Sequence, residues 1–233
     1  MTEPEVHKAA AKEGDDAMVN AITPSVTPIT KGQVAKFDEL WTAALRKSEI
    51  PSNLVQEVLK THGGTIAHEF VAIVRERAEA ISNTIVRKVK VNRARQPQAA
   101  ISATGRTFGG DGDVVATMPR GEGDEAEVVF FKPDDDEYTR PGSMSDDDLE
   151  KCLARRSLVA APPDDVAAVN EDDPSFADKY PHGTHWKNAD GEWCYAAFNR
   201  WYGERDVSVR RHDVFDWVDY WWFAGRRKKY SST

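Results

Sequence analysis

Large aromatic side chains are concentrated in the C-terminal third of the chain. Six of the seven tryptophans fall between Trp186 and Trp222, in the company of tyrosines and phenylalanines. Within this segment the Asp190-Gly191 step is a strong hairpin signal, and Val207 and Val209 alternate with polar residues, as in a strand with one buried face. The segment therefore predicts an antiparallel β-meander that holds the most specific packing of the protein.

A meander with one buried face presents alternate side chains to solvent, so some of these aromatic residues are candidates for binding. The competing interpretation is that most of the rings pack in the core. The candidate binding surface consists of tryptophans of this segment and the arginines beside them, namely Trp186, Trp193, Arg200, Trp201, Arg205, Trp217 and Trp222.

Apolar residues at helical spacing predict three helices ahead of this region. The helices span residues 30 to 47, 51 to 62 and 65 to 87, and the Gly63-Gly64 pair is expected to end the second one. At 1.5 Å per residue the third helix would be roughly 35 Å long, more than the two shorter helices cover. Its apolar stripe predicts either a homo-oligomer through residues 65 to 87 or packing across the C-terminal domain.

These patterns together predict the α+β class, with an N-terminal helical region followed by a C-terminal antiparallel β-meander with packed helices. We expect a disordered tail at 1–29 and a helical region for oligomerisation or docking at 30–92. An α+β domain with an aromatic-rich antiparallel sheet should follow at 93–225, ahead of a basic disordered tail at 226–233. Ser145, which precedes three aspartates, predicts a helix start.

The net charge of -8 conceals a strong asymmetry along the chain. Acidic residues dominate between 111 and 178, whereas basic residues dominate between 75 and 106. Such blocks are usually solvated faces, but a basic surface beside an acidic one also fits nucleic-acid binding or nucleic-acid mimicry. The candidate basic patch consists of Arg87, Lys88, Lys90, Arg93 and Arg95.

Few residues carry an obvious chemical role. His182, His185, Cys194 and His212 are candidate metal ligands, but their spacing does not match a familiar zinc site. The glycines between 105 and 112 lack the ending of a phosphate-binding loop and are expected to form a mobile loop. We therefore assign no catalytic, cofactor-binding or metal-binding residue, and catalysis is not the favoured interpretation.

The sequence also indicates a location. No apolar run approaches the roughly 20 residues that span a bilayer, and the first sixteen residues lack an apolar signal region. The two cysteines lie far apart in the sequence, as is typical of a reducing compartment. These features predict a cytoplasmic protein without a membrane association. No sequence motif indicates a cofactor, and none is expected.

Several stretches carry a resemblance to a known group of proteins. They are residues 92–106, 118–123, 145–150, 168–176 and 184–201. Over roughly residues 92 to 225 the chain resembles a family of uncharacterised bacterial proteins associated with phages and mobile elements. The resemblance implies an accessory or host-manipulating role, and it carries over no activity and no site residue.

The leading hypothesis is a non-catalytic interaction protein that binds a host or partner protein through acidic and aromatic surfaces, with nucleic-acid mimicry as one variant. One alternative is direct single-stranded nucleic-acid binding through residues 87–95 and exposed aromatic rings. Another is a metal-dependent hydrolase that uses His182, His185 and His212. The burial of Trp186, Trp201 and Trp222 discriminates between these hypotheses.

Overall fold

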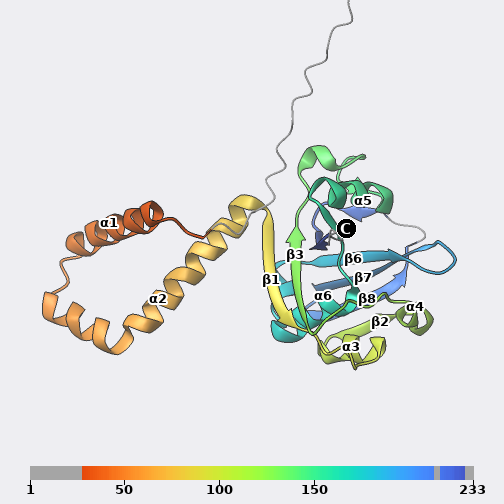
Figure 1. Cartoon of the computed structure of the whole chain (residues 1–233), viewed down its shortest axis with the longest axis horizontal. Coiled ribbons are helices and arrows are strands. Elements are labelled where there is room, and N and C mark those ends of the chain that lie inside the picture. Colours follow the sequence, from red (N-terminus) through yellow and green to blue (C-terminus); the bar gives the residue numbers. More distant parts are fainter. Residues whose placement is uncertain (1–27, 213–215, 229–233) are drawn as a thin grey trace, which may run out of the picture.

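The computed structural model describes residues 28–212 and 216–228. The disordered tails expected at the two ends lie largely outside these ranges. A helical arm precedes an α+β domain and projects away from it (Figure 1).

The elements up to residue 131 are α1 (Lys31–Lys47), α2 (Ser52–Ser82), β1 (Thr84–Lys90), α3 (Pro97–Ala103), β2 (Thr107–Gly110), α4 (Gly112–Ala116) and β3 (Glu125–Phe131). The remaining elements are the 3₁₀ turn Asp135–Glu137, β4 (Ser143–Met144), α5 (Asp146–Arg155), β5 (Leu158–Ala160), α6 (Pro163–Asp172), α7 (Phe176–Lys179), β6 (His182–Lys187), β7 (Trp193–Trp201), β8 (Glu204–Arg211), β9 (Trp217–Val218) and β10 (Trp222–Arg227).

The arm contains two helices where three were expected. Thr30 and Gln33 form a capping box that starts α1 as predicted. The Gly63-Gly64 pair does not end a helix, and α2 continues through it. Glycine weakens a helix interior by about 1 kcal/mol without stopping it, and the left-handed residue that does stop α2 is Asn83, at φ 46°. The β-branched residues after Asn83 then form β1, so the helix expected to reach Arg87 ends at Ser82.

The α+β class is confirmed, and its centre is a mostly antiparallel sheet with strand order β1-β3-β10-β6-β7-β8-β2, in which β5 also pairs with β10. Strands β6, β7 and β8 form the expected meander, and the side chain of Asn188 accepts the backbone N–H groups of Asp190 and Glu192 in its first turn. Strand β10 does not extend this meander. It pairs with β3 and β6 in the middle of the sheet.

Two expectations about irregular segments are corrected. The predicted mobile loop at residues 105 to 112 contains β2, which pairs in parallel with β8. The two backbones are so close that a Cβ on Gly110 would lie 2.2 Å from the carbonyl oxygen of Val209, which explains the need for glycine there. A C-terminal tail was expected from residue 226, but Arg226 and Arg227 belong to β10 and pair with β5.

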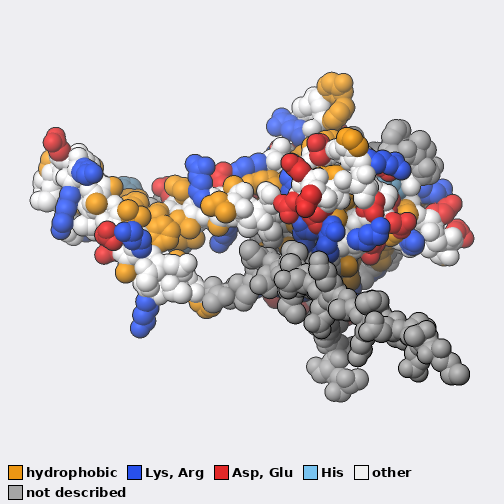
Figure 2. Space-filling model, turned by 90° about the horizontal axis from the view of Figure 1, so that it is seen from above, with side chains coloured by type: hydrophobic (Ala, Val, Ile, Leu, Met, Phe, Trp, Pro, Cys, Tyr) orange, Lys and Arg blue, Asp and Glu red, His pale blue; other side chains and the backbone are white. Residues whose placement is uncertain are grey.

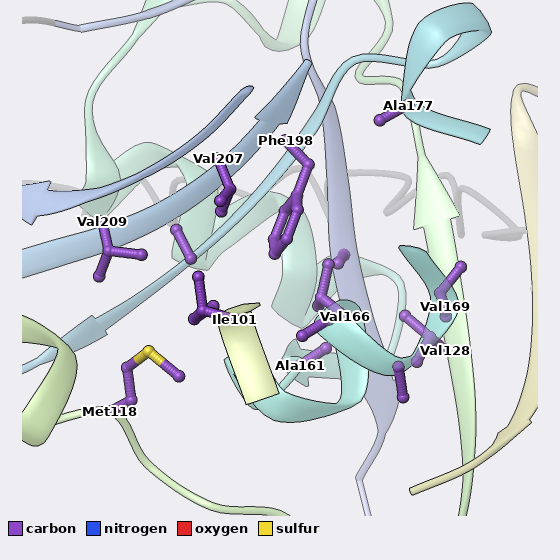
Figure 3. Close-up of a cluster of buried hydrophobic side chains, with 14 of the residues drawn as sticks. Ile101, Met118, Val128, Ala161, Val166, Val169, Ala177, Phe198, Val207 and Val209 are labelled. Atoms are coloured by element: carbon purple, nitrogen blue, oxygen red, sulfur yellow. The ribbon is translucent and has the colours of Figure 1, made fainter. Parts of the chain in front are cut away.

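Helices cover both faces of the sheet, not one. On one face α3, α4, α6 and α7 pack against side chains of the central strands, as Figure 3 shows for Ile101, Val166 and Phe198. On the other face α5 and the short β4–β9 pair cover a second cluster. Along β3 the side chains alternate between these layers, so that Val128 and Phe130 enter the first cluster and Val129 and Phe131 the second. Burial on both faces explains this uninterrupted apolar run.

Candidate functional site

Most of the candidate aromatic surface lies in the core. Trp186, Trp217 and Trp222 are 6%, 3% and 9% exposed, and they pack in the two clusters that flank the sheet. Trp193 is half-buried. Trp201, in contrast, is 56% exposed at the tip of the β7–β8 hairpin. Packing therefore accounts for most of these rings, because both faces of the sheet are covered.

The β7–β8 hairpin tip keeps the exposed part of the predicted surface. The rings of Trp201 and Tyr202 meet edge to face with their centroids 5.4 Å apart, and Tyr202 is 94% exposed. The flanking arginines share one carboxylate, Asp178 of α7, which lies 2.8 Å from Arg205 and 3.8 Å from Arg200. The tip thus presents two aromatic rings beside two arginines.

The candidate basic patch is also largely neutralised. Arg87 binds Glu79 of α2 at 2.6 Å. Arg93 is paired with two carboxylates of α6. The remaining pairs are Lys88 with Glu127 at 3.3 Å and Arg95 with Glu171 at 2.5 Å. Carboxylates therefore pair with four of the five residues of the candidate basic patch.

The four candidate metal ligands do not share one site. His182 and His185 project from opposite faces of β6, because residues three apart in a strand alternate in direction. His182 is fully buried between the Tyr180 carbonyl and the side chain of Asn170. Burial lowers its pKa to about 3, which keeps the ring neutral. Within residues 28–212 and 216–228, no three His, Cys, Asp or Glu side chains are grouped to hold a metal ion.

A buried polar network lies on the other face of the sheet, around the first residue of α5. Asp146 is 6% exposed and accepts hydrogen bonds from Nδ1 of His185 at 2.7 Å, Nδ1 of His212 at 2.5 Å and Nε1 of Trp217 at 2.8 Å. Nε2 of His185 lies 2.9 Å from Glu150. Both ring nitrogens of His185 thus face carboxylates, an arrangement that an imidazolium ion satisfies.

The opposite charges in this Asp146 network stabilise one another. Burial lowers the pKa of His185, but its hydrogen bonds with Asp146 and Glu150 outweigh burial and raise the pKa above its usual value. Burial likewise raises the pKa of Asp146, but hydrogen bonds from His185 and His212 outweigh it and hold that pKa well below its usual range. Trp193 stacks on the His185 ring at 4.5 Å. The network therefore anchors α5 to β6 and to the segment after β8.

Sequence patterns did not identify the Asp146 network. The helix start predicted at Ser145 is confirmed, since its hydroxyl accepts the backbone N–H of Asp148. Because a helix start by itself explains the three aspartates after Ser145, there was no reason in the sequence to expect a buried partner for one of them. The residues that Asp146 binds follow it by 39, 66 and 71 positions. The available signal was the pair His185 and His212, which the sequence presents as candidate metal ligands.

Among the described residues, most of the exposed large hydrophobic side chains lie on the arm. None of the residues of α1 or α2 is buried. The helices touch where Phe70 of α2 meets Phe37 and Trp41 of α1, with ring centroids 5.2 and 5.5 Å apart. Beside this contact lies a groove of about 320 Å³, and Figure 2 shows hydrophobic side chains gathered on the arm. The groove is lined by Val34, Phe37, Asp38, Trp41, Leu59, Gly63, Ile66, Ala67 and Phe70.

Ion pairs fix the base of the arm to the domain. Glu76 of α2 binds Lys179 of α7 at 2.6 Å, and Glu79 binds Arg87 of β1. The guanidinium of Arg87 also lies over the ring of Phe176 at 4.9 Å. These pairs connect the base of α2 to the domain, and the two helices extend away from it (Figure 1).

No protein-family model matches the chain, and neither a curated protein nor a solved structure matches it. The resemblance to phage-associated bacterial proteins stays an expectation. Across the described part of the chain, no helix has the length and apolar character that crossing a membrane requires.

Proposed function

We propose that this chain is a non-catalytic interaction protein whose helical arm is its docking element. The observation that carries the proposal is the apolar groove between α1 and α2, in helices with no buried residue. An amphipathic helix of a protein partner fits such a groove, since anchors spaced by three and four residues can enter it side by side.

The exposed area of the arm supports this proposal. Full burial of one large aliphatic side chain removes roughly 60–120 Å² of apolar surface, so ten half-exposed ones present on the order of 500 Å². This sum covers all sides of the two helices. The large apolar side chains of the two helices that are 39% exposed or more are Val34, Leu40, Trp41, Leu45, Leu54, Val58, Leu59, Val71, Ile73 and Ile81.

The alternative functions have weaker support. Nucleic-acid binding through residues 87–95 would first have to displace the carboxylates that pair with Arg87, Arg93 and Arg95. A hydrolase that uses His182 and His185 together would need a site that spans both faces of β6. The arm, in contrast, offers an open surface without any rearrangement.

A peptide with the sequence of residues 31 to 47 serves as a model amphipathic helix for the test. We expect the full chain to bind this peptide or the apolar dye ANS, and Trp41→Glu to abolish the binding of either probe. The matched control is Trp201→Glu, which changes a tryptophan of similar exposure outside the arm (56% against 46%). A monomeric chain that binds neither probe refutes the proposal.

A further inference from the structure

We infer that the occupant of the arm groove is the arm of a second copy of this chain. In this arrangement two α1–α2 arms pack about a two-fold axis as a four-helix bundle. The inference rests on the proposed function, because it names the partner of the same groove.

The first argument is charge. Within residues 31 to 82, basic and acidic side chains are equal in number. The basic residues are Lys31, Lys36, Arg46, Lys47, Lys60, Arg75 and Arg77, and the acidic ones are Asp38, Glu39, Glu49, Glu57, Glu69, Glu76 and Glu79. The net charge of -8 therefore belongs to the rest of the chain. Two arms can meet without net repulsion, whereas two acidic domains repel each other and are kept apart by the projecting arms.

The second argument is the shape of the arm. The groove, at about 320 Å³, is large enough for side chains but not for a whole helix. This suits packing in which side chains of one helix enter spaces between side chains of another. Each arm carries both the spaces, beside Phe70, and exposed apolar side chains such as Leu40 and Leu45. A unit that offers both is self-complementary, as a two-fold interface requires. Two helices from each copy complete a four-helix bundle.

The third argument is area. A stable interface buries about 800 Å² per partner, of which roughly 57% is apolar, or about 450 Å². The exposed apolar surface of one arm is on the order of 500 Å² by the estimate above. The exposed apolar area of the whole arm is therefore comparable to the apolar share of a standard interface, and a second copy has the same area from the same residues.

Sedimentation equilibrium of the full chain tests the inference. We expect a species of twice the 26.0 kDa chain mass at micromolar concentration. Trp41→Glu should raise the dissociation constant about 100-fold, because the two-fold axis repeats the lost burial and each copy contributes about tenfold. Leu59→Glu, at a 58% exposed position in the same groove, should act in the same direction. Trp201→Glu should leave the dimer intact, and circular dichroism checks that each variant keeps its helices.

The outcomes separate the two proposals. A dimer that Trp41→Glu and Leu59→Glu both dissociate, while Trp201→Glu does not, supports the inference. A monomer that binds the peptide of residues 31 to 47 or ANS through Trp41 overturns the second copy as occupant and leaves the docking function standing. A monomer that binds neither probe overturns both. A dimer unaffected by either arm substitution overturns the inference, because another surface then holds it.

Discussion

Replacing Asp146 with asparagine removes the negative charge at the centre of the buried network on α5. The three donors that reach this carboxylate lie at 2.5, 2.7 and 2.8 Å, and the residue is 6% exposed. Hydrogen bonds to charged groups contribute about 1.5–3 kcal/mol each, and removing one partner of a buried ion pair costs about 3–5 kcal/mol. The amide oxygen retains part of the hydrogen bonding, so we expect Asp146→Asn to lower the free energy of unfolding by about 4 kcal/mol.

The same substitution should change how stability depends on pH. The pKa of His185 is raised in the folded state, so its contribution is fully present below its unfolded pKa of about 6.5 and is lost as pH rises through the folded pKa. The pKa of Asp146 is lowered, so its contribution is present above its unfolded pKa of about 3.9 and is lost only as pH falls through the folded value. The wild-type chain should therefore lose stability on the alkaline side, and Asp146→Asn should lose less.

Urea unfolding at about pH 6 and about pH 9, followed by tryptophan fluorescence, measures both effects, since Trp193 stacks on His185 and Trp217 donates to Asp146. Asp147→Asn is the matched control, because Asp147 is the exposed neighbour in the first turn of α5. It should cost less than about 1 kcal/mol, which is the usual limit for a charge near a helix terminus. The reasoning fails if the two variants are equally stable, or if wild-type stability is constant across this pH range.

Two further predictions concern the backbone. Gly110→Ala should destabilise the chain by about 2 kcal/mol or more, because the added Cβ would lie 2.2 Å from the Val209 carbonyl oxygen. Gly112→Ala is the control and should change stability little, because the space around Gly112 is open. Thermal unfolding of both variants checks this, and equal melting temperatures would contradict it. Tyr202→Asn should raise the free energy of unfolding by about 0.5–1 kcal/mol, because Tyr202 is 94% exposed and lies at φ 48°, a conformation that asparagine adopts more readily. A variant that is less stable in urea unfolding would contradict this and show that the Tyr202 ring makes a favourable contact.

Local patterns predicted many of the elements. The alternation at Val207 and Val209, the turn at Asp190-Gly191 and the cap at Ser145 each correspond to an element of the structure. Each of these signals involves only a few neighbouring residues, which determine the backbone conformation at that point of the chain. The Gly63-Gly64 pair misled for the same reason, since helix termination depends on whether a following residue takes the left-handed conformation, as Asn83 does, and not on glycine alone.

Contacts between distant residues could not be predicted in this way. Strand β10 lies between β3 and β6 because its apolar side chains fill both layers of the core, a result of packing across the whole domain. The basic patch is neutralised by residues such as Asp164 and Glu171, which follow their arginine partners by 71 and 76 positions. No pattern within a window of ten or twenty residues contains such pairings.

The sequence by itself determined the α+β class, the helical arm with its apolar stripe and the aromatic meander, because helix and strand periods and turn residues act locally. Only the tertiary structure decided which tryptophans are buried, which arginines are paired and that Asp146 lies at the centre of a charged network. Burial and charge pairing depend on which segments meet in space. Part of the apolar stripe predicted for the arm, including Ile73 and Ile81, is exposed in the folded chain, and the structure adds the groove in which we expect a second copy to bind.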